Sequence, residues 1–142
     1  MLKIEARQMF RSNGLIDDFA VYGAPDDYLQ FAEIIKSSLL SGKSATLGTN
    51  STISLEIVLS DNESQELFTS LQNESDEYYS MKEWQERKIL RVVGSEKILN
   101  ELHLFLVNLS SRGEGYSYIS EYSENYKYSN NSPEWRLHVE NT

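Results

Sequence analysis

The sequence of 142 residues contains no cysteine, only two prolines, and only 13 lysines and arginines against 22 acidic residues. The absence of cysteine excludes a disulfide framework, a thiol nucleophile and cysteine-based zinc or iron–sulfur sites. The shortage of basic residues gives a formal net charge of −9 at pH 7. Because such a surface repels phosphate backbones and anionic lipids, direct binding to nucleic acid or to a membrane surface is disfavoured.

Long apolar runs are also missing from the sequence. The longest apolar stretch, at residues 102–109, is far shorter than the roughly 20 residues that a membrane-spanning helix needs. The first residues include Glu5 and lack the apolar segment of a signal peptide. These features favour a soluble cytoplasmic protein. No linker rich in proline, glycine and serine interrupts the chain, so we expect a single domain over residues 1–142.

The residues that most catalytic and metal sites require are scarce. The two histidines, His103 and His138, form no metal-binding spacing with each other or with nearby acids. No nucleophile elbow, phosphate-binding loop or dinucleotide-binding glycine motif occurs. We therefore expect no metal, no cofactor and no enzymatic activity. We expect His103 to be a partly buried helix residue and His138 to lie on the open face of a strand.

The pattern of apolar residues predicts two long helices, at residues 25–40 and 95–111. Pro25 suits the first turn of the first helix, Gly42 ends it, and Ser95 caps the second. Alternating apolar residues predict strands at 1–9, 19–22, 45–47, 53–59, 87–93, 116–122, 126–128 and 135–139. A short helix is predicted at residues 61–72, with Leu67, Phe68 and Leu71 facing inward.

The predicted elements contain a weak internal repeat of strand, helix, strand and strand. Aligning Gly23 with Gly94 superimposes the apolar positions of the two helices, although most residue identities differ. Either the repeat reflects a duplication, or two strand–glycine–helix units simply look alike. The pattern predicts an α+β fold with a single antiparallel-rich sheet and both long helices packed on one face.

Two surface features favour protein binding. Between Lys43 and Lys82 the chain has no lysine or arginine but seven acidic residues, and residues 116–128 are rich in tyrosine. Tyrosine offers contact area with a polar tip, and together with carboxylates it complements lysine and arginine side chains. The predicted partner is therefore a basic protein. The candidate contact residues are Glu114, Tyr116, Tyr118, Glu121, Tyr122 and Glu124, with Asp61, Glu63 and Glu66 as a second acidic patch.

Four segments resemble the immunity proteins of bacterial polymorphic-toxin and contact-dependent inhibition systems, in particular the immunity protein 32 family. They are residues 22–26 (YGAPD), 93–99 (VGSEKIL), 114–122 (EGYSYISEY) and 131–139 (NSPEWRLHV). Most of the resemblance lies in residues 87–140. It implies a small cytoplasmic protein that binds and blocks a cognate toxin domain.

Three functions stay open at this point. The first is an immunity protein that neutralises a toxin by stoichiometric binding. If the toxin is a nuclease, its active site must be basic to hold phosphate, and an acidic inhibitor can occupy that site. The second is a small enzyme that uses paired carboxylates, with Asp17–Asp18 and Asp26–Asp27 as adjacent pairs. The third is an adaptor or a homodimer subunit without a toxin partner.

Overall fold

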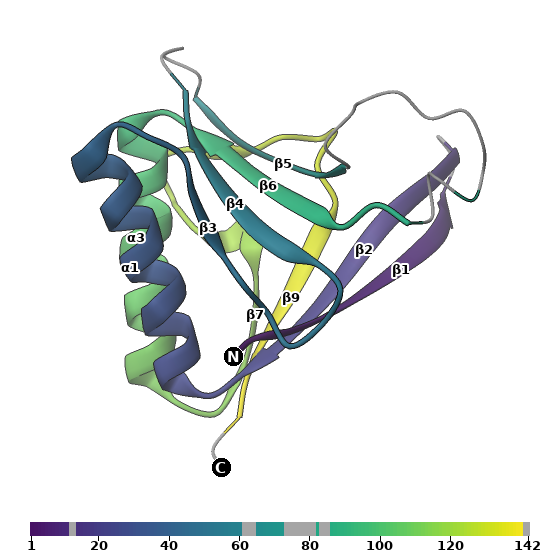
Figure 1. Cartoon of the computed structure of the whole chain (residues 1–142), viewed down its shortest axis with the longest axis horizontal. Coiled ribbons are helices and arrows are strands. Elements are labelled where there is room, and N and C mark those ends of the chain that lie inside the picture. Colours follow the sequence, from purple (N-terminus) through teal and green to yellow (C-terminus); the bar gives the residue numbers. More distant parts are fainter. Residues whose placement is uncertain (12–13, 61–64, 73–81, 83–85, 141–142) are drawn as a thin grey trace.

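The computed structural model describes residues 1–11, 14–60, 65–72, 82 and 86–140 (Figure 1). Its helices are α1 (Pro25–Ser41), α3 (Glu96–Arg112) and the 3-10 helix η1 (Ile119–Glu121). Its strands are β1 (Lys3–Arg11), β2 (Gly14–Gly23), β3 (Ala45–Leu47), β4 (Ser54–Leu59), β5 (Glu66–Gln72), β6 (Ile89–Gly94), β7 (Gly115–Tyr118), β8 (Lys127–Tyr128) and β9 (Glu134–Val139).

The fold is α+β, as the sequence predicts, but the strands form two sheets instead of one. Sheet A has the strand order β1-β2-β9-β7, and sheet B has the order β3-β4-β6-β5-β8. The helices α1 and α3 lie side by side along one edge of the molecule and run in opposite directions (Figure 1). The prediction of a single antiparallel-rich sheet is wrong: the strands form two sheets, and three of the strand pairings, β2 with β9, β4 with β6 and β5 with β8, are parallel and join distant parts of the chain.

Local sequence accounts for the ends of both helices. At the start of α1, the carboxylate of Asp27 accepts a hydrogen bond from the Ala24 N–H at 2.9 Å. At its end, Gly42 adopts a left-handed conformation (φ 71°) and donates its N–H to the Ser38 carbonyl. The hydroxyl oxygen of Ser95 accepts from the Ile98 N–H and so caps α3.

Two long parallel strand pairs tie the halves of the chain together, in addition to the short parallel pair of β5 with β8. In sheet A, β2 pairs with β9 from Asp18↔Glu134 to Gly23↔Val139. In sheet B, β6 pairs with β4 over the same length, from Ile89↔Ser54 to Gly94↔Leu59. The next N–H along extends each pair, from Glu140 to the Gly23 carbonyl and from Ser60 to the Gly94 carbonyl. The two parallel pairs are therefore built to the same register.

The predicted repeat of strand, helix, strand and strand is present as β2-α1-β3-β4 and β6-α3-β7-β9. The second and third strands of each unit pair antiparallel, β3 with β4 and β7 with β9. The first strand of each unit, however, pairs with the last strand of the other unit. Each sheet therefore combines strands from both units.

One cluster of buried apolar side chains fills the space between the sheets and the helices. Trp135 of β9 lies fully buried in it, with the ring of Phe19 at 6.0 Å and that of Phe31 at 6.4 Å between centroids. Its indole N–H donates to the Thr69 hydroxyl of β5 at 3.3 Å. This side chain thus contacts sheet A, sheet B and α1 at once.

Three predicted elements differ from the structure. The helix predicted at residues 61–72 is wrong, because Glu66–Gln72 is the strand β5, while 61–64 lie outside the described residues. The strand predicted at 116–122 ends at Tyr118, and the chain then turns through η1. The short strand at 126–128 is β8, which pairs with β5 and not with β7.

The junction between β6 and α3 leaves no room for a side chain at Gly94. A Cβ atom there would lie 2.8 Å from Cγ2 of Ile98 and 3.3 Å from Cδ2 of Leu99. Since Ile98 is β-branched and fully buried, it cannot turn away easily. We expect Gly94→Ala to lower the free energy of unfolding by about 1–3 kcal/mol, measured by urea denaturation.

Gly48→Ala is the matched control, because no atom lies within 4 Å of the corresponding Cβ position. This control should change the free energy of unfolding by less than about 0.5 kcal/mol, as exposed substitutions usually do. Equal stability of the two variants would show that the junction is less tightly packed than the structure indicates.

Candidate protein-binding face of sheet A

Sheet A has one buried face and one face turned away from the core. Side chains of alternate residues point to opposite faces of a strand. The inward residues of β2 and β9, such as Val21 and Leu137, are fully buried. Their neighbours therefore project outward, together with alternate residues of β1 and β7. We call this outward surface the outer face of sheet A.

Four rings lie next to one another across the outer face of sheet A. The rings of Tyr22 and His138 stack at 4.7 Å between centroids with an interplanar angle of 11°. Tyr116 lies 5.7 Å from His138 on the other side, and Tyr118 meets Tyr116 edge-on at 5.9 Å. We call these four residues, Tyr22, His138, Tyr116 and Tyr118, the aromatic strip. Tyr116 is its most open member, with 59% of its surface exposed.

Arg136 lies beside the aromatic strip. Its guanidinium carbon is 5.8 Å from the ring centroid of Tyr116 and 5.8 Å from that of Tyr118. Exposed contacts of this kind are worth about 0.5–1 kcal/mol each. The two rings therefore hold an exposed cation at a defined position on the face.

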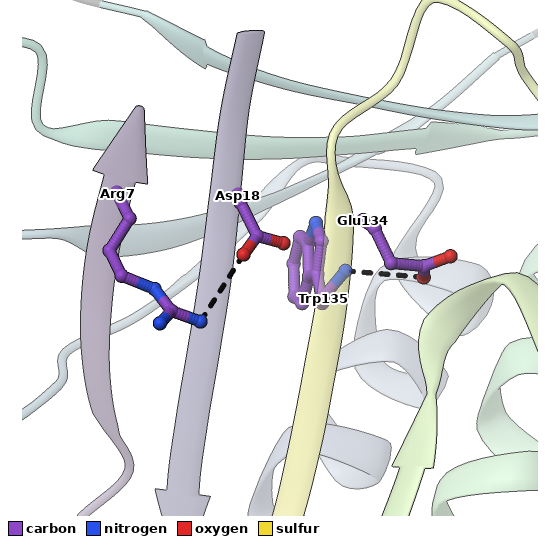
Figure 2. A network of polar contacts seen from close by, with 4 residues as sticks. All are labelled: Arg7, Asp18, Glu134 and Trp135. Atoms are coloured by element: carbon purple, nitrogen blue, oxygen red, sulfur yellow. Dashed lines mark hydrogen bonds and ion pairs between the residues drawn. The ribbon is translucent and has the colours of Figure 1, made fainter. Parts of the chain in front are cut away.

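Several other charged side chains that the structure describes on the outer face of sheet A have partners. Arg7 pairs with Asp18 at 3.2 Å across β1 and β2 (Figure 2). Lys3 pairs with Glu5 at 3.3 Å. The carboxylate of Glu134 points away from the Arg7–Asp18 pair in Figure 2 and accepts the backbone N–H of Trp135 at 3.2 Å.

Glu134 also fastens the end of β7. Its Oε2 accepts the Ser120 hydroxyl at 2.7 Å, and its Oε1 accepts the Ser120 N–H at 3.2 Å. Because Ser120 lies in η1, directly after β7, these bonds fix the point at which the chain leaves sheet A. They help to hold Tyr118 in place beside Arg136.

His138 is held in its neutral form by its surroundings. Partial burial lowers the pKa of His138, the positive charge of Arg136 lowers it further, and Glu140 opposes both with a smaller effect. At neutral pH the ring is therefore uncharged and stacks on Tyr22 as an aromatic group. Its position on the open face of β9 confirms the prediction for this residue, and the half-buried His103 of α3 confirms the other.

The structure places the predicted carboxylates around β7 and on sheet B. Glu114 precedes β7, whereas Glu121 and Glu124 follow it, and all three are exposed. The carboxylate of Glu121 also accepts the Tyr118 N–H at 3.2 Å. Glu66 is an exposed residue of β5 in sheet B and is not part of this face. Asp61 and Glu63 lie outside the described residues.

Tyr122, predicted as a contact residue within a strand at 116–122, is not a surface residue. It is only 3% exposed, and its hydroxyl donates to the Lys127 carbonyl at 2.8 Å. The strand ends at Tyr118 and η1 turns the chain back toward the core, so strand alternation no longer applies. Tyr126 and Tyr128 also pack against the core.

Two residues of this face, Tyr22 and Arg136, were not predicted from the sequence, and neither was the contact of His138 with the tyrosines. Arg136 and His138 alternate with buried residues along β9, so their outward direction could be read from the sequence. Their proximity to Tyr22 depends on the parallel pairing of β2 with β9, for which the sequence gives no signal. Arg136 also changes the predicted character of the surface, because a cation lies among the tyrosines.

The acidic pairs of the alternative enzyme hypothesis do not converge in the described part of the chain. Asp18 pairs with Arg7, and Asp27 caps α1. Among the described residues, no group of three histidine or acidic side chains could hold a metal ion. Within the same residues, no helix combines the length and the apolar character needed to cross a membrane.

No known protein family, no curated protein and no solved structure shows a significant match to this chain.

Truncation of Tyr122 and of Tyr116 should have different consequences. Tyr122→Ala removes a buried ring and a hydrogen bond, so we expect a loss of about 3–5 kcal/mol in the free energy of unfolding. Tyr116→Ala removes an exposed ring and should cost less than about 1 kcal/mol. Thermal and urea unfolding of the two variants tests this assignment. A strongly destabilised Tyr116→Ala variant would contradict the placement of Tyr116 on the surface.

Proposed function

We propose that this chain is an immunity protein that binds and neutralises a cognate bacterial toxin domain by stoichiometric protein–protein contact. The observation that carries this proposal is the aromatic strip, a row of four neighbouring rings on the outer face of sheet A of which Tyr116 is the most exposed. Exposed aromatic side chains with an adjacent arginine are the residue types that dominate binding energy in protein interfaces. In this role the protein acts by binding and not as an enzyme.

The charge of the chain favours a basic partner. The net charge is −9, and three exposed carboxylates flank β7 in the sequence: Glu114 directly precedes the strand, and Glu121 and Glu124 follow it. A nuclease-type toxin domain carries a basic surface that holds phosphate. Carboxylates can take the place of those phosphates, and opposite net charges speed the encounter. Since such a toxin acts inside the cell, the proposed location of the inhibitor is the cytoplasm.

Affinity purification from the native host is the direct test. The tagged protein should retain one toxin domain at equal molar amount, identified by mass spectrometry, and adding the protein should abolish the activity of that domain. A Tyr116→Ala, Tyr118→Ala double variant is the matched negative control, because it removes two rings of the aromatic strip and no residue of the buried cluster. Retention of the toxin by this variant at undiminished affinity would contradict the proposed surface.

The association rate should depend on salt. Raising the salt from about 0.05 M to about 0.5 M shortens the screening length from roughly 14 Å to roughly 4 Å. We expect the association rate to fall by about tenfold or more, whereas the dissociation rate changes less. Surface plasmon resonance with the purified toxin domain measures both rates.

Charge reversal separates the local carboxylates from the overall charge. Glu121→Lys and Glu124→Lys should each slow association. Glu33→Lys changes the net charge equally but lies on the exposed side of α1, so it should have a smaller effect. An association rate that responds to none of these changes would count against a partner attracted by this face.

A further inference from the structure

Arg136 is a cation without a counter-ion among the described residues. On the same face, Arg7 pairs with Asp18 and Lys3 pairs with Glu5. The contacts of the Arg136 guanidinium are the two rings of Tyr116 and Tyr118. An arginine has five N–H donors in a planar fork, and aromatic rings do not satisfy them as a carboxylate does.

Sheet B contains an arginine that does have a carboxylate partner across its parallel strand pair. In sheet B, Arg91 lies directly across the parallel pair from Glu56 and donates to its carboxylate at 3.0 Å. The corresponding pair in sheet A is Ala20 and Arg136. In that correspondence Ala20 takes the place of Arg91 and Arg136 takes the place of Glu56, so Arg136 faces a methyl group across the pair and not a carboxylate.

The neighbour on the other side does not supply a charge either. Arg136 lies across the antiparallel pair from Tyr118. Its two cross-strand neighbours are therefore Ala20 and Tyr118, and neither can neutralise it. The guanidinium is held in position by rings while its donors remain available to a group that arrives from outside the sheet.

We propose that Arg136 binds an aspartate or glutamate side chain of a partner protein, with an apolar side chain of that partner lying on Tyr116 and Tyr118. A carboxylate matches the guanidinium fork and can accept two parallel hydrogen bonds. This inference rests on the proposed function only for the identity of the protein that carries the carboxylate. It adds that a partner that is basic overall presents an acidic residue at the centre of the contact.

A protein is favoured over single-stranded RNA as the occupant. Stacked rings next to an arginine would also suit bases and phosphate. However, a strand of RNA brings many phosphates toward a chain of net charge −9, whereas a protein side chain brings one carboxylate. Because fewer negative charges have to approach the acidic chain, a protein carboxylate is favoured over RNA.

The test is nuclear magnetic resonance with two short synthetic peptides. The probe is acetyl-Phe-Glu-amide, and its control is acetyl-Phe-Gln-amide, which keeps the ring and the shape but lacks the charge. We expect the Glu peptide to shift the Arg136 side-chain N–H and the ring signals of Tyr116 and Tyr118. The Gln peptide should shift the same signals several-fold less at equal concentration.

Two variants make the assignment specific. Arg136→Gln should abolish the difference between the two peptides. Lys3→Gln removes one positive charge from the same face but from a residue that is already paired with Glu5, so the difference should persist. Since both positions are exposed, both variants should fold, as a thermal unfolding curve would verify.

Several results would overturn the inference. These are equal shifts from both peptides, shifts confined to another surface, or no shift at all. Stronger shifts of the same rings by hexauridylate would favour RNA instead. Because the peptides contain no toxin sequence, this test is independent of the toxin. A captured toxin whose complex leaves Arg136 in water would refute this inference alone, and a positive peptide result without any captured toxin would refute the proposed function alone.

Discussion

The two long parallel strand pairs, β2 with β9 and β4 with β6, are the constraint on which the rest of the structure depends. Each pair joins one strand from the first half of the chain to one from the second, so neither sheet is complete with one half alone. The buried cluster, centred on Trp135, draws on both halves for the same reason. The helices then close one side, with His103 of α3 hydrogen-bonded to the Ala32 carbonyl of α1 at 2.9 Å. Folding of either half therefore requires the other, as expected of a single cooperative unit.

Elements set by local chemistry could be predicted from the sequence, and pairings set by distant contacts could not. The helices α1 and α3 follow from an apolar stripe with a proline, serine or glycine at the ends, which are signals within one segment. The strand β5 was predicted as a helix because Leu67, Phe68 and Leu71 also fit helical spacing. Its buried alternation of Leu67, Thr69 and Leu71 becomes decisive only once β6 lies beside it. A parallel pair such as β2 and β9 has no turn signal, since its strands are separated by most of the chain.

In the candidate site too, local features could be predicted from the sequence and contacts between distant segments could not. Tyr116 and Tyr118 could be identified from the sequence because both lie in one short strand, β7. The alternation of side chains along that strand correctly predicts that the two tyrosines share its outward side. Tyr122 could not be placed from the sequence. Alternation of side chains predicts their direction only while the strand continues, and here η1 follows β7 directly. The neighbours of these tyrosines come from β2 and β9, so the contact of Arg136 with two rings exists only after the sheet has formed. A surface predicted from one segment was therefore described as acidic and aromatic, whereas the folded face has a cation beside its tyrosines.

On the proposed function, the charges of this protein act at two ranges. The net charge of −9 is felt across about 10 Å of physiological solution and selects partners that are basic overall. Arg136 acts only in contact, because its positive charge is outweighed by the rest of the chain at a distance. Once a partner covers Arg136, its guanidinium loses its hydrating water. A partner that offers no carboxylate then leaves the charge buried and unpaired, which lowers the affinity. A partner must then be basic as a whole and acidic at one point. Two opposite requirements of this kind reject most proteins that would satisfy either one, so the contact charge supplies specificity while the net charge supplies speed.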